Sequence, residues 1–366
     1  MTYSIKIQTK YNLIIIHATK TKTMNQIFIM SRRRLAVIAG RGGGGDITGL
    51  TQTDGSFFCS IILSPKHRFG LQFRPKFTIT ADLNSKYVLD SIHSYFGCGK
   101  VTINTKNYTA EYEVVKLEDL KKNIIPHFKD YPVFCAKLHA FNLFSEIVYF
   151  YFYLFSLCNK EKRTIEGRRV LLKMGLSMNA TTNRTEDRID LLFSLLDVKD
   201  EISKFLIPNT ITSKDTPVTS DNISGIIDGD GSLFIYFQKD GSIKTGFNIT
   251  SDRLSRPLLE KIQKELKGIG SINEGTKNDL VFTVSGLHQI TDVLIPFIDS
   301  NPLFSERSLH YDKFKTVSLL LRNEQPLTLE KKLQIVELAY NMNKEGKHRR
   351  LNKTEYIELL YSLEKT

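Results

Sequence analysis

The chain has 366 residues and a formal net charge of +12, so it is long enough for two compact domains and favours an anionic partner. Hydrophobic residues make up 41% of the chain, which argues against disorder and provides for two cores. Its four cysteines show no zinc-site spacing. The longest apolar run, residues 147–158, is too short to span a membrane, which takes about 20 residues.

Residues 1–45 form a basic extension. They contain eight Lys or Arg residues and no acidic residue, so most of the excess positive charge lies there. A basic start without acids is typical of a mitochondrial targeting segment, with the chloroplast as the alternative destination. We expect this extension to be disordered, with Gly42–Gly45 as a flexible joint to a first domain at 46–207.

Residues 46–57 read Asp-Ile-Thr-Gly-Leu-Thr-Gln-Thr-Asp-Gly-Ser-Phe, which predicts a short helix followed by a strand. Asp46 is a good N-cap residue, because its side chain can accept a backbone hydrogen bond of the first turn. Gly55 would end the helix in a left-handed conformation.

Residues 71–80 alternate between apolar and polar, which predicts a strand with one buried and one polar face. Arg and Gln on a polar face are the side chains that recognise guanine and adenine in the major groove of DNA. An ordinary solvated sheet face is the alternative for this pattern taken alone. The candidate DNA-binding residues of this strand, the preceding strand and the turn between them are Phe58, Ser60, Lys66, Arg68, Gln72, Arg74 and Lys76.

A stretch rich in Thr and Ser, residues 208–221, reads as a linker to a second domain at 222–366. That domain opens with a second copy of the phrase, Asn-Ile-Ser-Gly-Ile-Ile-Asp-Gly-Asp-Gly-Ser-Leu-Phe at 222–234. From Asp54 to Pro126 there are 72 residues and from Asp230 to Pro296 there are 66, so the repeat continues downstream and is shorter in the second half. The candidate DNA-binding residues of the second half are Tyr236, Gln238, Lys244 and Asn248.

Each half therefore predicts the order helix–strand–strand–helix–strand–strand–helix, so the fold class is α+β with two pseudo-symmetric domains. Gly49 and Gly225 occupy equivalent places in the two motif helices. Because glycine lets another backbone approach closely, we expect the two motif helices to form the domain interface there. The alternative is that each glycine packs against its own sheet.

The repeated phrase resembles the LAGLIDADG motif of homing endonucleases. Residues 223–231 follow the motif closely, and residues 47–55 follow it more loosely, with Gln52 where the family often has an acid. The resemblance implies two αββαββα domains whose antiparallel sheets form a saddle over double-stranded DNA, in a monomeric protein. It also implies site-specific hydrolysis of both DNA strands with Mg²⁺, which promotes intron homing. Intron-encoded members often carry read-in extensions, which is a second interpretation of residues 1–45.

The acid before the final glycine of each motif, Asp54 or Asp230, is the implied catalytic residue and metal ligand. By the same resemblance, the backbone carbonyls of Thr53 and Gly229 complete the metal shell. Capping of its own Asp-Gly turn is the alternative role for each aspartate. Lys116 matches the position of a family lysine near the phosphate, and its counterpart in the second half is Gly286. This asymmetry predicts that one strand is cut faster, or that binding persists without cleavage.

Two other functions fit the same fold. One is an RNA maturase that binds a group I intron RNA, possibly in addition to cleaving DNA, and the other is a DNA-binding regulator. Neither needs paired acids, so Asp54 and Asp230 favour the nuclease.

Overall fold

The computed structural model describes residues 2–8, 13–19, 43–156, 164–178, 185–209, 216–324, 326–342 and 349–364. They fall into two units, Met1–Gly43 and Gly44–Thr366. In the first unit, β1 (Thr2–Gln8) and β2 (Leu13–Thr19) form an antiparallel pair with Ile5 opposite Ile16. The rest of the predicted basic extension up to residue 42 lies outside the described ranges.

The second unit contains the predicted succession of elements twice, which confirms the α+β class. The first repeat comprises α2 (Gly44–Asp54), β3 (Gly55–Leu63), β4 (Leu71–Asp82), α3 (Lys86–Phe96), β5 (Lys100–Asn104), β6 (Thr109–Val114), α4 (Leu117–Asp119), a π-helical turn (Leu120–Ile124) and α5 (Ile125–Asp130). The second comprises α10 (Ser220–Asp230), β7 (Gly231–Phe237), β8 (Ile243–Asp252), α11 (Arg256–Glu265), β9 (Ser271–Glu274), β10 (Asp279–Val284), α12 (Leu287–Gln289), a π-helical turn (Ile290–Leu294) and α13 (Ile295–Ser300).

Each repeat forms one four-stranded antiparallel sheet, in the order β3-β4-β6-β5 and β7-β8-β10-β9. The alternation predicted for residues 71–80 is present, with Leu71, Phe73, Phe77 and Ile79 all buried. Phe57 lies opposite Phe77 in the register, and their rings stack with centroids 5.1 Å apart. One face of each sheet is therefore fixed against helices, which leaves the other for polar side chains.

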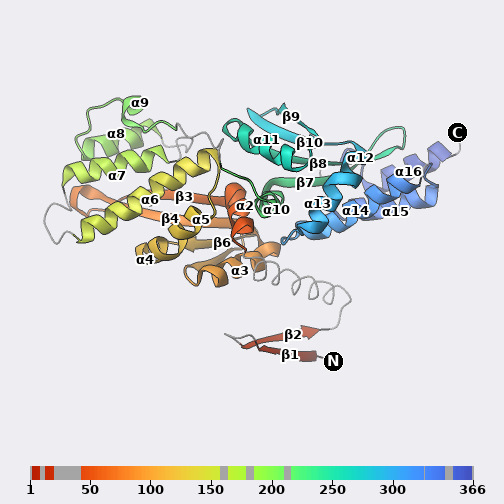
Figure 1. The fold of residues 1–366 in the computed structure, drawn as a ribbon, viewed down its shortest axis with the longest axis horizontal. Coiled ribbons are helices and arrows are strands. Elements are labelled where there is room, and N and C mark those ends of the chain that lie inside the picture. Colours follow the sequence, from red (N-terminus) through yellow and green to blue (C-terminus); the bar gives the residue numbers. More distant parts are fainter. Residues whose placement is uncertain are drawn as a thin grey trace. The chain divides into compact units, whose positions relative to one another are not determined.

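The two motif helices lie side by side between the two sheets (Figure 1). At their crossing, a Cβ added to Gly225 would lie 2.8 Å from the Leu50 nitrogen and 2.9 Å from the Gly49 Cα. A Cβ added to Gly49 would in turn collide with the Asn222 carbonyl. Only glycine fits at either position, because each backbone occupies the space of the other's side chain.

The ends of the motif helices differ from the sequence prediction. Helix α2 begins at Gly44, so Gly44 and Gly45 are buried helical residues rather than a flexible joint, and Asp46 lies inside the helix. The N-cap of α10 is Thr219, which forms a capping box with Asn222. Gly231 is extended (φ −66°, ψ 136°) and not left-handed. It is glycine because a Cβ would lie 2.6 Å from the Ile227 carbonyl oxygen.

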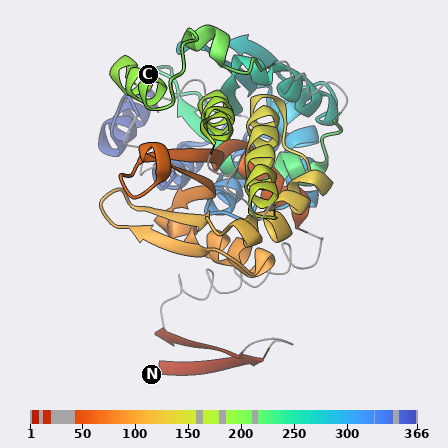
Figure 2. The same ribbon diagram turned by 90° about the vertical axis from the view of Figure 1, so that its left-hand side faces the viewer.

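Further helices cover the sheets on the side opposite the polar face. They are α6 (Cys135–Ser156), α7 (Ile165–Ser177), α8 (Glu186–Leu195) and α9 (Ile202–Phe205) in the first half, and α14 (Arg307–Asn323), α15 (Leu329–Tyr340) and α16 (Lys353–Glu364) in the second. Helices α6 and α7 pack on β3 (Figures 1 and 2). Among the described residues, no helix combines the length and apolar character needed to cross a membrane.

Candidate functional site

The crossing of the motif helices brings two carboxylates together. Helix α2 ends at Asp54 and α10 ends at Asp230, and both side chains are exposed to solvent. A Cβ added to Gly229, the residue before Asp230, would lie 3.1 Å from Asp54 Oδ2. The short helices and their glycine contact thus place two anionic groups at neighbouring positions, one from each half.

Both carboxyl groups have raised pKa values. Partial burial, followed by repulsion from Asp230, raises the pKa of Asp54 to about 6, against the attraction of Arg307 and Lys137. Burial also raises the pKa of Asp230, and the same two cations oppose that shift. Two acids that repel each other and still face solvent are suited to bind a divalent cation, because the cation removes the repulsion.

Two cations beside the carboxylates were missed by the sequence analysis. Lys137, in the first turn of α6, donates from Nζ to the Gly55 carbonyl at 2.5 Å. Arg307, the first residue of α14, donates from Nε to the Asp228 carbonyl at 2.7 Å and from its terminal nitrogens to the carbonyls of Gly229 and Gly231. Burial lowers the pKa of Lys137, and attraction to Asp230 and Asp54 opposes this shift.

A signal for these two cations was present in the sequence. Residues 132–137 read Pro-Val-Phe-Cys-Ala-Lys and residues 302–307 read Pro-Leu-Phe-Ser-Glu-Arg. Lys137 follows Asp54 by 83 residues and Arg307 follows Asp230 by 77, the same shortening as elsewhere in the repeat. The structure does not bring Lys116 to the carboxylates, because its side chain is 68% exposed and reaches Asp119 at 3.9 Å. The geometry therefore favours Lys137 over Lys116 as the basic group of the first half.

The side chains at motif positions 52 and 228 fix the starts of the helices that carry these cations. The Gln52 Oε1 accepts a hydrogen bond from the Phe134 backbone nitrogen at 2.8 Å. The buried Asp228 carboxylate accepts from the backbone nitrogens of Phe304 at 2.8 Å and Ser305 at 3.0 Å. Gln52 can replace the usual acid because the position needs an acceptor oxygen and not a charge.

The donor groups fit a hydrated divalent ion held by few protein ligands. Mg²⁺ typically takes one or two carboxylates and completes its octahedron with waters and substrate phosphates. Asp54 and Asp230 supply that number, and among the described residues no cluster of three or more His, Cys, Asp or Glu side chains suggests another metal site. Of the two predicted carbonyl ligands, that of Gly229 already accepts a hydrogen bond from Arg307. The Thr53 side chain lies against Gly229 at the same place.

The open face of the first sheet carries the predicted polar residues in cross-strand pairs. Phe58 lies opposite Lys76, Ser60 opposite Arg74, and Ile62 opposite Gln72. Arg74 is exposed, as is Lys66 in the turn, whereas the side chain of Arg68 lies outside the described part.

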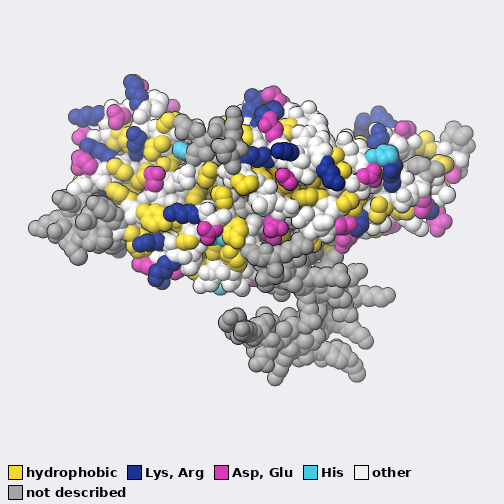
Figure 3. All heavy atoms as spheres, viewed as in Figure 1, with side chains coloured by type: hydrophobic (Ala, Val, Ile, Leu, Met, Phe, Trp, Pro, Cys, Tyr) yellow, Lys and Arg dark blue, Asp and Glu magenta, His cyan; other side chains and the backbone are white. Residues whose placement is uncertain are grey.

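Lys76 is not available as a free cation on this face. Its Nζ forms ion pairs with Glu111 at 2.9 Å and Glu113 at 2.5 Å on β6. These glutamates share the open face, so the positive surface of the first sheet is narrower than the sequence of β4 alone suggests. Figure 3 shows the same mixture on the face it displays, where Lys and Arg side chains are interspersed with Asp and Glu.

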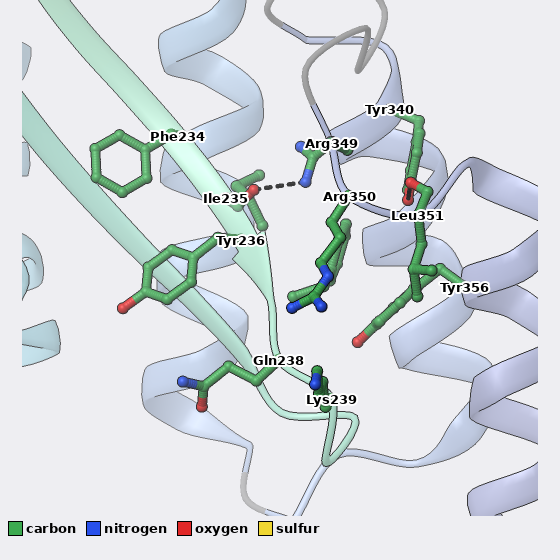
Figure 4. A pocket seen from close by; sticks show the side chains of 11 residues that line it. Phe234, Ile235, Tyr236, Gln238, Lys239, Tyr340, Arg349, Arg350, Leu351 and Tyr356 are labelled. Carbon is green, nitrogen blue, oxygen red and sulfur yellow. Dashed lines mark hydrogen bonds between the residues drawn. The ribbon is translucent and has the colours of Figure 1, made fainter.

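The open face of the second sheet carries Tyr236 opposite the exposed Lys244, and Ser232 opposite Asn248. Gln238 accepts a hydrogen bond from the Ser242 hydroxyl at 2.6 Å, which holds it in the β7–β8 turn. Tyr236 and Gln238 also line a pocket of about 400 Å³ at the outer end of β7, next to Arg349 and Arg350 (Figure 4). Arg349 donates to the Ile235 carbonyl at 2.8 Å and so ties residue 349 to this edge strand.

Comparison with known proteins decides the family. A family model described as LAGLIDADG endonuclease matches residues 47–148 and 223–318, which include both motif helices and both sheets. The chain belongs to the LAGLIDADG endonuclease family. The two matches confirm the resemblance drawn from the motifs, and they place Asp54 and Asp230 at the ends of the two family motifs.

Individual relatives agree with the family assignment. A protein of Neurospora crassa named probable intron-encoded endonuclease 2 is 26% identical over 301 residues, which cover 81% of this chain and 64% of that protein. The chain thus spans less than two thirds of that relative. A Mycosarcoma maydis protein named probable intron-encoded DNA endonuclease 1 is 24% identical over 259 residues, 70% of this chain and 91% of that protein. The structure of the I-LtrWI LAGLIDADG homing endonuclease bound to target DNA shares the fold, with a TM-score of 0.72, 24% identity and coverage of 82% and 98% of the two chains.

The raised pKa of Asp54 predicts a pH dependence of divalent-ion binding. A protonated carboxyl group does not bind a cation, so we expect affinity for Ca²⁺ in the DNA complex to fall as the pH is lowered from 7 to 5. The stability of the metal-free protein should change in the opposite sense. The folded state binds this proton more tightly than the unfolded state, so this group adds stability as the pH falls through about 6.

Calorimetric titration with Ca²⁺ between pH 5 and pH 8 measures this dependence. The Asp54→Asn variant is the control, and we expect a flatter profile for it because the titrating group is gone. An affinity that stays constant over this pH range in the wild-type protein would contradict the prediction.

Proposed function

We propose that this chain is a site-specific DNA endonuclease that uses Mg²⁺ to hydrolyse both strands of a long target and thereby promotes intron homing. The observation that carries the proposal is the pair of carboxylates at the adjacent ends of two crossing motif helices. Two equivalent acids in one chain suit a substrate with two equivalent bonds. The intron-encoded relatives and the acid-free basic start of the chain support a mitochondrial location.

The residues of the chain have separate roles in this function. Asp54 and Asp230 hold the divalent ion, which when bound activates water and neutralises the leaving oxygen. Lys137 and Arg307 place positive charge beside the same acids, where they stabilise charge on a scissile phosphate. The open sheet faces position the duplex, with Arg74, Gln72, Lys244 and Asn248 toward base edges. Because both halves are in one chain, a monomer provides a complete site.

The proposal of an RNA maturase has no separate support in the structure. The open faces that would bind RNA are the same ones that carry the proposed DNA contacts, and no described feature favours RNA. The paired carboxylates have no use in a purely structural RNA-binding role.

Cleavage of a randomised duplex library tests the proposal. Purified full-length protein is incubated with the library in Mg²⁺ and in Ca²⁺, and the cut ends are sequenced. We expect one asymmetric site of about 20 base pairs, since each half covers about one helical turn of 10–10.5 base pairs. Cleavage in Mg²⁺ alone supports the proposal, and tight selection of one duplex sequence with no cut in either ion would contradict it.

A further inference from the structure

The two basic side chains beside the carboxylates occupy equivalent positions but hold the backbone differently. The carbonyls of residues 52, 53 and 55 in the first half correspond to those of residues 228, 229 and 231 in the second. Lys137 contacts one carbonyl of its set, that of Gly55. Arg307 contacts all three of its set: Asp228, Gly229 and Gly231.

The difference follows from the chemistry of the two side chains. A lysine ammonium is a compact point charge on a flexible stem, whereas a guanidinium is a rigid fork with five N–H donors. The fork of Arg307 spans the last turn of α10 and the first residue of β7, where helix carbonyls lack partners and the helix dipole favours a cation. Arg307 is therefore fixed more firmly than Lys137.

The contact with Gly229 matters because this carbonyl belongs to the residue before Asp230. A divalent ion held by Asp230 and the Gly229 carbonyl would share that oxygen with a guanidinium at hydrogen-bonding distance, and two cations so close repel each other. In the first half, the contact of Lys137 is with Gly55, two residues beyond the equivalent carbonyl of Thr53. The second half thus presents a more hindered place for the ion.

We propose that Arg307 is a positioning residue that makes the two halves unequal: it occupies the Gly229 carbonyl, weakens divalent-ion binding in the second half, and causes the two DNA strands to be cut in a fixed order. The inference rests on the proposed endonuclease function and adds to it the order of the two cuts. The strand served by the first half is cut first, and a nicked duplex accumulates.

Exchange of the two basic residues tests this inference. Strand-resolved cleavage of an end-labelled target is measured for the wild-type protein, Arg307→Lys, Lys137→Arg and the double exchange. We expect the wild-type protein to cut one strand about tenfold faster, the effect of one charge-assisted hydrogen bond of ordinary strength. Arg307→Lys should bring the two rates together, and the double exchange should reverse the order.

A remote arginine provides the matched control. Arg169 on α7 also donates to two carbonyls, those of Leu196 at 2.7 Å and Asp197 at 2.8 Å, but lies outside the carboxylate site. We expect Arg169→Lys to leave the ratio of the two rates unchanged. A second readout that does not depend on cleavage is the binding of Ca²⁺ to the uncut DNA complex, where Arg307→Lys should tighten the weaker of the binding steps.

The outcomes separate the inference from the function on which it rests. If the wild-type protein cuts neither strand, the endonuclease function fails. If it cuts both strands at equal rates, or if the double exchange leaves the order unchanged, the role of Arg307 fails and the function stands. Reversal of the order together with tighter Ca²⁺ binding in Arg307→Lys supports the inference.

Discussion

Replacement of both Asp54 and Asp230 by Asn should slow cleavage at least about 1,000-fold, since metal-assisted charge stabilisation contributes several kcal/mol to such reactions. The amide keeps the shape of the side chain but removes the charge that holds the ion. The raised pKa of Asp54 shows that the two carboxylates repel each other when no ion is bound. The double variant should therefore melt at a higher temperature than the wild-type protein in the absence of divalent ions.

Strand-resolved cleavage and thermal unfolding of the same preparations measure both effects. Asp90→Asn is the matched control, because Asp90 is a surface aspartate paired with Lys86 at 2.6 Å on α3, away from the site. It should leave the cleavage rate unchanged. A double Asn variant that folds and still cuts at the wild-type rate would remove both aspartates from the mechanism.

The opposing effects on stability and cleavage are a consequence of how the site is built. Two acids brought together at the ends of packed helices destabilise the metal-free protein, and the nearby Lys137 and Arg307 offset part of that cost. The arrangement is retained in both halves, which is expected if the charge is needed for function rather than for folding.

The fold was predictable because the chain repeats its own pattern. Period-two alternation at residues 71–80 fixed which face of β4 is buried, and the equal spacing of Asp54–Pro126 and Asp230–Pro296 showed a second copy of the domain. The ends of the motif helices were not predictable from local preference alone. Gly55 and Gly231 read as helix C-caps, but close approach of the strand to the last helical turn, and not a left-handed conformation, requires glycine at Gly231.

The candidate site was only partly predictable, because two of its features depend on contacts distant in sequence. Lys116 was chosen from its local motif, whereas the cations beside the carboxylates come from the starts of α6 and α14, which Gln52 and Asp228 hold in place. Lys76 was read as a DNA contact because it alternates with buried residues on β4. Its pairing with Glu111 and Glu113 depends on the register of β4 with β6, which the sequence of one strand does not contain.

Gly225→Ala should destabilise the protein by about 3 kcal/mol or more, at the upper end of the effect of overpacking a core. The added methyl group would lie 2.8 Å from the Leu50 nitrogen and would also collide with the Asp46 carbonyl, and neither backbone group can rotate away. The two motif helices would have to separate, which would also pull Asp54 and Asp230 apart. We therefore expect loss of cleavage at temperatures where the variant is still folded.

Gly175→Ala is the matched control for this effect, because Gly175 is also a buried helical glycine. A methyl group there would lie 3.4 Å from Ile61 Cδ1, which is ordinary contact, and the change should stabilise α7 by up to about 1 kcal/mol through helix propensity. Denaturant unfolding of the two variants compares them directly. Equal stabilities would mean that the crossing of α2 and α10 tolerates side chains, and the close approach of the two carboxylates would then need another explanation. A large difference would show that the same glycine contact joins the two halves and assembles the site, so that stability and cleavage depend on one helix crossing.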